Sequence, residues 1–288
     1  MNGILWKSKT RETDMSFFKN YKFSLMNLFD SELYEVDNKG ELSDINNLFV
    51  IDEHFLPHKE FLTDLSTIQK INKHNVNVII FNTEKIFNSY WPHNQKIQKK
   101  LSKINSMVQI LSDVNDIKKL GTPFKNKQYL SKEFKFNNNL SRKKNKILFY
   151  GQLDGGVYKN RRIIINNFQK MFGDNLEVIK STRDKSYREY INLLSSFQYI
   201  LNPLGAGEFI NIRYFEALAV NSIPIQEITN VMRDYYIEEI SSNNSVFFSN
   251  TTELENFKLN EMKNYNFSNP FYLEDYLFVN NLISFLRQ

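Results

Sequence analysis

The chain has no cysteine among its 288 residues, and it is poor in glycine and proline, with 9 and 6. Without cysteine there can be no disulfide scaffold, no thiolate metal site and no cysteine nucleophile. The low glycine and proline content excludes collagen-like and linker-like chains. No run of about 18 apolar residues occurs, so the sequence offers no candidate for a membrane-spanning helix.

The remaining composition is that of a folded protein. Hydrophobic residues make up 41% of the chain, aromatic residues 15% and charged residues 24%. These values and the chain length predict two domains, each with its own core. The first 21 residues are charged and lack the apolar core of a signal peptide. We therefore expect a cytoplasmic protein, in the host cytoplasm if the gene is viral.

The net charge of +5 conceals a strongly basic segment. Between Lys85 and Lys146, 15 lysines and arginines stand against 3 acidic residues, a balance of +12. Such a segment is either a solvated face or a surface for a polyanion, such as nucleic acid, anionic lipid head groups or an acidic glycan. It carries no motif of a sequence-specific DNA-binding domain.

Short apolar runs alternate with segments of helical period, a pattern typical of parallel α/β domains. In the first half the expected strands are 4–6, 33–36, 48–51, 76–82 and 107–111, and the expected helices 17–29, 59–74 and 95–103. In the second half the expected strands are 146–150, 176–180, 199–203, 223–227 and 245–249, and the expected helices 160–172, 187–197 and 209–221.

A polar segment from residue 121 to residue 146 predicts the connection between the two domains. We expect an N-terminal domain over 1–140, a C-terminal domain over 141–268, and a helical tail over 269–288 that packs back across the domains. Ligands of open parallel sheets bind beyond the carboxyl ends of the strands. Candidate site residues are therefore sought just after the strands.

The first candidate is a glycine-bearing loop between strand and helix, which begins at Gly151-Gln152 and continues through Gly155-Gly156 to Arg161 and Arg162. Such a loop lets backbone N–H groups approach a phosphate, and arginines in the following turn can grip a diphosphate. The alternative is a tight turn followed by an exposed basic helix.

The second candidate is the pair Arg213 and Glu216, three residues apart on one helix face at the edge of an apolar stripe. This position suits a nucleotide-sugar, with the arginine on the diphosphate and the carboxylate on the ribose hydroxyls. The alternative is an ordinary surface ion pair, worth a few tenths of a kcal/mol.

The third candidate is Glu84, which follows the expected strand 76–82. A carboxylate there can take the proton of an acceptor hydroxyl, or it can be a helix N-terminal acid favoured by the helix dipole. The rival bases are three residues just after the expected strand 48–51, namely Asp52, Glu53 and His54. The histidines show no metal-ligand spacing and there is no Asp-x-Asp pair, so we expect no metal site.

The run from Phe209 to Ile225, with its Arg-x-x-Glu helix followed by Ala-Leu-Ala-Val-Asn-Ser-Ile-Pro-Ile, resembles the donor-binding helix and next strand of GT-B glycosyltransferases. Among these, the likeness is greatest to the bacteriophage DNA β-glucosyltransferases, which share a Tyr-Gly loop leading to arginines. Thr83-Glu84 and the run Ser89-Tyr90-Trp91-Pro92 are similar to that family as well, with Glu84 in place of an aspartate.

The resemblance implies a GT-B fold, α/β with two Rossmann-like parallel-sheet domains facing an interdomain cleft. It implies that Arg213 and one of Arg161 or Arg162 bind the diphosphate of a UDP-sugar, that Glu216 binds the ribose, and that Glu84 is the base. The UDP-sugar would be a co-substrate; no tightly bound cofactor and no essential divalent metal are implied.

The expected activity is transfer of a hexose from a nucleotide-sugar to an acceptor hydroxyl. The acceptor favoured by the resemblance and the basic segment is a hydroxymethylated pyrimidine in phage DNA, with Tyr90 and Trp91 helping to hold the base out of the stack. The alternatives are a bacterial surface glycan or lipid-linked sugar as acceptor, a GT-B nucleotide-sugar epimerase or hydrolase, and a non-catalytic polyanion-binding protein.

Overall fold

The structure is a computed structural model of the whole chain. It describes residues 2–6, 16–30, 32–35, 45–52, 69–70, 73, 76–82, 104, 106–121, 127, 129–133, 144–153, 155, 158–181, 185–259 and 271–279.

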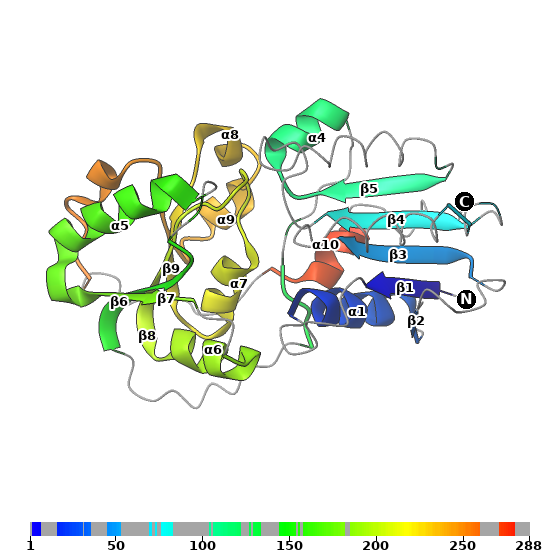
Figure 1. Cartoon of the computed structure of the whole chain (residues 1–288), viewed down its shortest axis with the longest axis horizontal. Helices are drawn as coiled ribbons and strands as arrows, with labels where there is room; N and C mark the ends of the chain where they lie inside the picture. Colours follow the sequence, from blue (N-terminus) through cyan, green and yellow to red (C-terminus); the bar gives the residue numbers. More distant parts are fainter. Residues whose placement is uncertain are drawn as a thin grey trace. The chain divides into compact units, whose positions relative to one another are not determined.

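The chain divides into two compact units (Figure 1). Unit 1 comprises Met1–Phe134 and Tyr272–Gln288, and unit 2 comprises Lys135–Phe271. Each unit contains a five-stranded sheet in which every pair of neighbouring strands is parallel. This confirms the expected α/β class with two Rossmann-like parallel-sheet domains, while the cleft between them stays a prediction.

Unit 1 has the strand order β2-β1-β3-β4-β5. The strands are β1 (Asn2–Trp6), β2 (Tyr34–Glu35), β3 (Asn47–Asp52), β4 (Asn77–Asn82) and β5 (Met107–Leu111), and the helices α1 (Ser16–Phe29), α4 (Val114–Leu120) and α10 (Leu273–Val279). The interior strand β4 is buried along almost its whole length, as parallel strands covered on both faces are.

An asparagine ladder crosses three neighbouring strands of unit 1. Asn2, Asn47 and Asn77 are register partners at the amino ends of β1, β3 and β4. The amide of Asn77 donates to Asn47 Oδ1 at 3.0 Å, and that of Asn47 donates to Asn2 Oδ1 at 2.9 Å. Because a slip of one residue would separate these amides, the ladder favours a single strand register.

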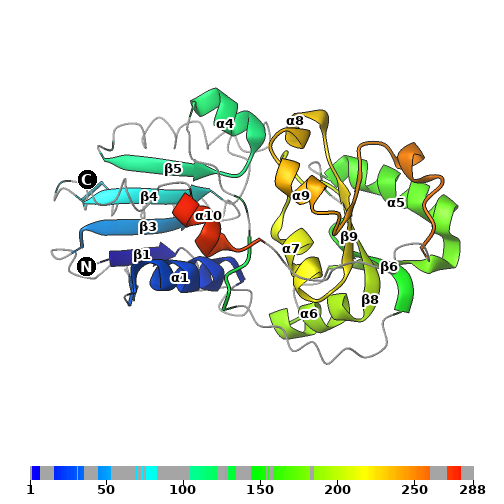
Figure 2. The ribbon, with the colours of Figure 1, turned by 180° about the vertical axis from the view of Figure 1, so that it is seen from behind.

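The C-terminal helix α10 packs against α1, and the two lie side by side in both ribbon views (Figures 1 and 2). Leu130 pairs with Tyr272 just before the helix begins. The buried Glu274 carboxylate accepts the Ser131 hydroxyl and the backbone N–H of Lys132, the latter at 3.1 Å. The tail segment from Tyr272 thus belongs to unit 1.

Unit 2 has the strand order β10-β9-β8-β6-β7. Its strands are β6 (Lys144–Gly151), β7 (Leu176–Lys180), β8 (Phe197–Asn202), β9 (Ile223–Glu227) and β10 (Val246–Phe248), and its α-helices α5 (Lys159–Phe172), α6 (Tyr187–Ser195), α7 (Ile212–Ala219), α8 (Asn230–Arg233) and α9 (Ile237–Ser241). Short 3₁₀ turns cover Gly173–Asn175 and Thr251–Leu254.

The alternation of side chains along β6 builds two cores, one on each face of the sheet. Ile147 and Phe149 pack with Phe168 of α5, whereas Leu148 and Tyr150 pack with residues of α6 and with Ala217 of α7. The ribbon accordingly has α5 on one face of the sheet and α6 and α7 on the other (Figure 1). This is a doubly wound arrangement.

The boundaries of α7 differ from the sequence expectation of 209–221. The helix starts only at Ile212, because the Asn211 side chain caps it by accepting the N–H of Arg213. It ends at Ala219, and Asn221 takes a left-handed conformation with φ 56° that lets the chain leave the helix. The short helices α4, α8 and α9 were not expected, and the expected helices 59–74 and 95–103 fall largely outside the described residues.

Candidate functional site

The strand order of unit 2 locates the place where a ligand is expected. From β6 the chain passes first to β7 on one side and then returns to β8 on the other, so the order reverses between β6 and β8. Crevices at such a reversal, beyond the carboxyl ends of the strands, are the usual ligand sites of open parallel sheets. Gly151 ends β6 and Asn202 ends β8.

Arg161, in the first turn of α5, spans this reversal. Its side chain is buried, with 6% of the residue exposed. Its Nε donates to the carbonyl of Leu204 at 3.0 Å and its Nη1 to the carbonyl of Gln152 at 3.3 Å. The guanidinium also lies over the ring of Tyr158, with Cζ 4.4 Å from the ring centroid. The cation is therefore fixed between the loops that follow β6 and β8.

Arg162, by contrast, is exposed. Successive residues of an α-helix point about 100° apart, so only one of two adjacent arginines can face the sheet edge. The sequence left the choice between Arg161 and Arg162 open, and the structure brings Arg161 to the carboxyl edge.

Arg213, in the first turn of α7, approaches the same edge from the other side. Its Nη1 lies 3.5 Å from Asn202 Oδ1, and its backbone N–H is held by the Asn211 cap. Its Nε atom is buried and has no hydrogen-bond partner among the described residues. An unsatisfied buried donor on a charged group is costly, and a bound anion would relieve that cost.

The two arginines converge on Gly151. A Cβ built on this glycine would lie 3.6 Å from Nη1 of Arg161 and 3.6 Å from Nη1 of Arg213, so the two nitrogens lie within twice that distance of each other. Like charges at such a separation repel by about 2 kcal/mol at an effective dielectric constant of 20. The absent side chain of the glycine leaves backbone for an anion to approach.

The loop after β8 contributes a second glycine position. A Cβ built on Gly205 would lie 3.2 Å from Nη2 of Arg161. The backbone N–H of Leu204 donates to Glu227 at 2.7 Å, while its carbonyl accepts from Arg161. Burial raises the pKa of the Glu227 carboxyl, although the Leu204 N–H and the charge of Arg161 oppose the rise. Hydrogen bonds thus hold the loop through both backbone groups of Leu204, its N–H and its carbonyl.

Neither this loop nor the buried side-chain amides of Asn202 and Gln226 had been selected from the sequence. The signal was present in Gly205-Ala206-Gly207, a second glycine pair between a strand and a helix. Asn202 and Gln226, both fully buried, share a hydrogen bond of 2.6 Å between the ends of β8 and β9. Their network orients the Asn202 oxygen that faces Arg213.

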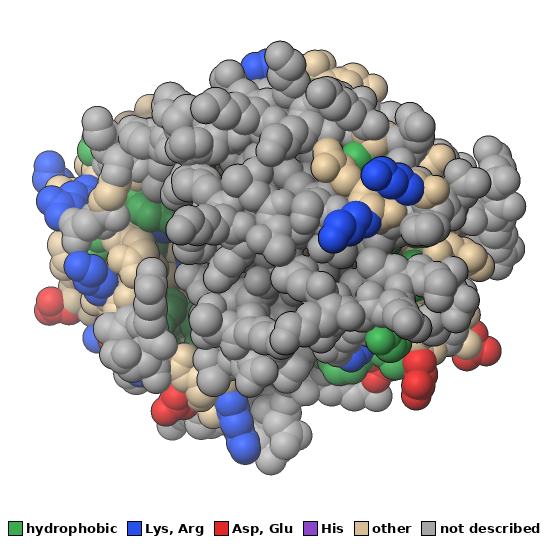
Figure 3. All heavy atoms as spheres, turned by 45° about the vertical axis from the view of Figure 1, so that its right-hand side comes forward, with side chains coloured by type: hydrophobic (Ala, Val, Ile, Leu, Met, Phe, Trp, Pro, Cys, Tyr) green, Lys and Arg blue, Asp and Glu red, His purple; other side chains and the backbone are tan. Residues whose placement is uncertain are grey.

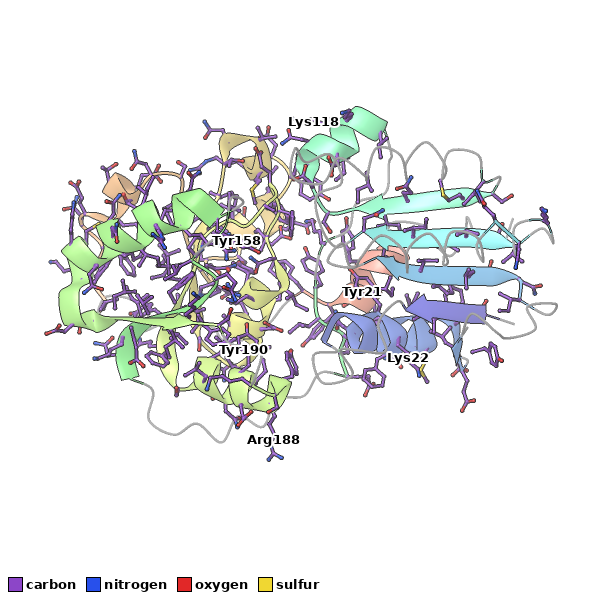
Figure 4. The ribbon with its side chains drawn as sticks, viewed as in Figure 1. Tyr21, Lys22, Lys118, Tyr158, Arg188 and Tyr190 are labelled. Carbon is purple, nitrogen blue, oxygen red and sulfur yellow. The ribbon has the colours of Figure 1, made fainter. Side chains whose placement is uncertain are left out.

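Glu216 lies one turn after Arg213 on α7, with 2% of the residue exposed. Its two carboxylate oxygens accept the hydroxyl of Tyr187 at 2.9 Å and the hydroxyl of Tyr190 at 2.7 Å. Both tyrosines lie on α6. Figure 4 shows Tyr190 on the side of α6 that faces the sheet and Arg188 pointing away from the domain. Arg213 and Glu216, which the sequence singled out by their spacing, therefore do not form an exposed surface ion pair.

The remaining predicted residues of unit 2 lie around the first loop. Gln152 donates through Nε2 to the carbonyl and the hydroxyl of Ser181, both at 3.0 Å, and so joins the loop after β6 to the end of β7. Gly155 has φ 116°, a conformation open to glycine. Gly156 lies outside the described residues.

Of the residues predicted from the sequence to serve the acceptor, the structure describes fewer. Five of them lie outside the described residues: Glu53, His54, Glu84, Tyr90 and Trp91. Asp52 is the last residue of β3, and the strand order of unit 1 reverses between β1 and β3. Asp52 therefore ends a strand at the reversal of its own sheet, whereas β4 ends one strand further along at Asn82.

Most of the basic segment 85–146 also lies outside the described residues. On the one face of the molecule that Figure 3 shows, the described Lys and Arg side chains appear as separate groups. Within the described ranges no three His, Asp or Glu side chains gather as a metal site would require. None of the described helices has the length and apolar character needed to cross a membrane. The expectations of a polyanion surface and of metal independence stay predictions.

No protein-family model matches the chain, and neither does any curated protein. Among solved structures, the chain is similar to a crystal structure of an alpha1,3-fucosyltransferase, with 11% identity and a TM-score of 0.42 over 100% of this chain and 81% of that one. A crystal structure of alpha1,3-fucosyltransferase with GDP-fucose is similar with 10% identity and a TM-score of 0.43, over 100% of this chain and 90% of that one. Both likenesses are distant, so the function proposed below rests on the side chains of unit 2.

Proposed function

We propose that the chain is a glycosyltransferase that binds a nucleotide-sugar in unit 2 and transfers the sugar to an acceptor hydroxyl. The observation that carries this proposal is the convergence of Arg161 and Arg213 on Gly151, at the reversal of strand order. Guanidinium groups bind phosphate oxygens as planar forks, and two of them suit the two phosphoryl groups of a diphosphate. The glycine allows the diphosphate to reach the backbone.

The same arrangement suits the chemistry of transfer. The bond between the anomeric carbon and the diphosphate oxygen breaks as the acceptor oxygen bonds to that carbon, and negative charge grows on the leaving diphosphate. Arg161 and Arg213 would offset this charge from fixed positions. Glu216, whose two oxygens each accept a tyrosine hydroxyl, is the proposed partner of the ribose hydroxyls.

The acceptor hydroxyl must lose its proton to a base. Glu84 is the proposed base, with Asp52 and His54 as rivals. The proposed acceptor is a hydroxymethylated pyrimidine of phage DNA, met by the basic segment 85–146 and by Tyr90 and Trp91. The competing acceptor is a surface glycan or lipid-linked sugar. Salt-sensitive binding to duplex DNA without binding to anionic vesicles would favour DNA, and the opposite result would favour the membrane-associated acceptor.

The donor proposal is tested with two adjacent arginines. Titration calorimetry with UDP and with GDP should show binding to the wild-type protein, and Arg161→Ala should weaken it about 10- to 100-fold, since a charge-assisted contact contributes about 1.5–3 kcal/mol. The exposed Arg162→Ala is the matched control and should bind like the wild type. Equal losses in the two variants would contradict the assignment of Arg161.

An epimerase or hydrolase of the same architecture would bind the nucleotide-sugar equally well. The two activities separate when the nucleotide-sugar that binds is incubated without any acceptor. A transferase should leave most of it intact until an acceptor is added, whereas an epimerase or hydrolase would convert it at the full rate. A polyanion-binding protein would bind none of the nucleotides.

A further inference from the structure

Glu227, the last residue of β9, is connected to Arg161 through the backbone of Leu204. Its carboxylate accepts the N–H of Leu204 at 2.7 Å, and the carbonyl of Leu204 accepts Nε of Arg161 at 3.0 Å. The carboxylate, one loop residue and the guanidinium thus form a continuous chain of hydrogen bonds. This chain runs from the end of β9, through the loop after β8, to the first turn of α5.

The β9 end of this hydrogen-bond chain is fixed in the sheet. Glu227 is the register partner of Phe248 in β10, and its own carbonyl accepts the side-chain amide of the buried Gln226 at 2.6 Å. The next residue, Ile228, donates its backbone N–H to the carbonyl of Phe248 at 2.8 Å. Because the backbone is held on both sides of residue 227, the carboxylate projects from an anchored strand end.

The loop end needs such an anchor. Leu204 lies between Pro203 and Gly205, and these three residues belong to no strand or helix. A glycine also lets the backbone beside it rotate freely. A Cβ built on Gly205 would lie 3.2 Å from Nη2 of Arg161, so the loop backbone lies close to the guanidinium. A small rotation of this loop would therefore move both the carbonyl that holds Arg161 and the backbone beside it.

We infer that Glu227 is a positioning residue of the diphosphate site, which fixes the direction of the Arg161 guanidinium through Leu204. With Nε held by the Leu204 carbonyl and Nη1 by the carbonyl of Gln152, the planar guanidinium keeps one orientation beside Gly151. A carboxylate is a strong acceptor for the N–H that sets this loop. Glu227 itself touches no phosphate in this scheme. The inference rests on the proposed function for its role in binding, and on these contacts for its geometry.

The matched variants are Glu227→Gln and Glu227→Met, whose new side chains are unbranched, similar in length and uncharged. Only the glutamine keeps an oxygen for the Leu204 N–H, so the comparison separates the hydrogen bond from the loss of charge. Titration with UDP, GDP and inorganic pyrophosphate should show affinity about 3- to 10-fold lower in Glu227→Met than in Glu227→Gln, the range of one hydrogen bond. Equal affinities in these two variants would overturn the inference.

A double-mutant cycle separates positioning from general loss of structure. In an Arg161→Ala background, the two replacements of Glu227 should bind equally, because their difference passes through the missing guanidinium. A difference of the same size in that background would overturn the inference. The control is Glu253→Met, which removes another carboxylate of unit 2 that accepts a backbone N–H, that of Ser249 at 3.3 Å. It should bind like the wild type, and a loss equal to that of Glu227→Met would also overturn the inference.

A second measurement needs no ligand at all. The Nε–H of Arg161 is the donor to Leu204, and its exchange with solvent can be followed by arginine-selective ¹⁵N NMR, with the signal assigned from Arg161→Lys. Exchange should be slow in the wild type and in Glu227→Gln, and several-fold faster in Glu227→Met. If the wild type binds neither nucleotides nor pyrophosphate, the proposed function fails while this comparison still decides whether Glu227 positions Arg161. Equal exchange rates in the two variants would overturn that role even in a protein that binds nucleotides well.

Discussion

A Cβ built on Gly205 would lie 3.2 Å from Nη2 of Arg161, closer than ordinary van der Waals contact. The contacting atom is the end of a long side chain, so Gly205→Ala should displace the guanidinium rather than disrupt the fold. We expect nucleotide diphosphate affinity to fall several-fold, with a change in unfolding free energy below about 1 kcal/mol. Calorimetric titration and urea unfolding of the same preparation measure the two quantities.

The control for this prediction is the Arg161→Ala background. Without the guanidinium the added methyl group meets no arginine, so Gly205→Ala should then have little further effect on affinity. A several-fold loss that persists in this background would place the effect in the loop itself.

Glu227 predicts a pH dependence of stability. Burial raises its pKa above the ordinary value of 4.5, so the folded chain binds this proton more tightly than the unfolded chain. The stabilisation is complete below the unfolded value and is lost as the pH rises through the folded pKa. Glu227→Gln keeps an acceptor for the Leu204 N–H without a titration. Its stability relative to the wild type should therefore increase as the pH rises above about 4.5, measured by urea unfolding. A difference independent of pH would contradict the raised pKa.

Two neighbouring acids of α10 should differ sharply in their effect on stability. Glu274→Ala removes the buried acceptor of the Lys132 N–H and should destabilise unit 1 by about 1–3 kcal/mol. Asp275→Ala removes the ion pair between Asp275 and Lys132. Because the Lys132 side chain is 48% exposed and the Asp275 side chain 59% exposed, this loss should lower the free energy of unfolding by well under about 1 kcal/mol. Denaturant unfolding with a fluorescence probe in unit 1 compares them. Equal effects would mean that the tail is not held through Glu274.

The asparagine ladder gives a graded prediction. Asn47→Ala removes both amide bonds of the ladder, whereas Asn2→Ala removes the single bond that Asn47 donates. At about 1 kcal/mol or less for each half-buried bond, the loss of unfolding free energy should be roughly twice as large for Asn47. Equal losses would indicate that the two bonds do not contribute separately.

Much of unit 2 could be predicted from the sequence. The expected strands 176–180 and 223–227 coincide with β7 and β9, because apolar alternation and length are properties of the local chain. The start of α7 was misplaced by three residues, since the apolar residues at 209 and 210 continue the helical period although Asn211 is the cap. The cap shows only when its side chain is seen to accept the N–H of Arg213.

The sequence by itself determined that the chain is α/β. It also showed that Arg161 and Arg162 follow a glycine-bearing loop, and that Arg213 lies three residues before Glu216 on a helix. These are consequences of composition and of spacing over a few residues. Only the tertiary structure decided that Arg161 rather than Arg162 faces the sheet edge, and that Arg161 holds a loop 43 residues away at Leu204. It also supplied Tyr190, which meets Glu216 across 26 residues of chain. The physical reason is that hydrogen bonds between separate elements depend on how α5, α6 and α7 pack on the sheet, and no local period encodes that packing.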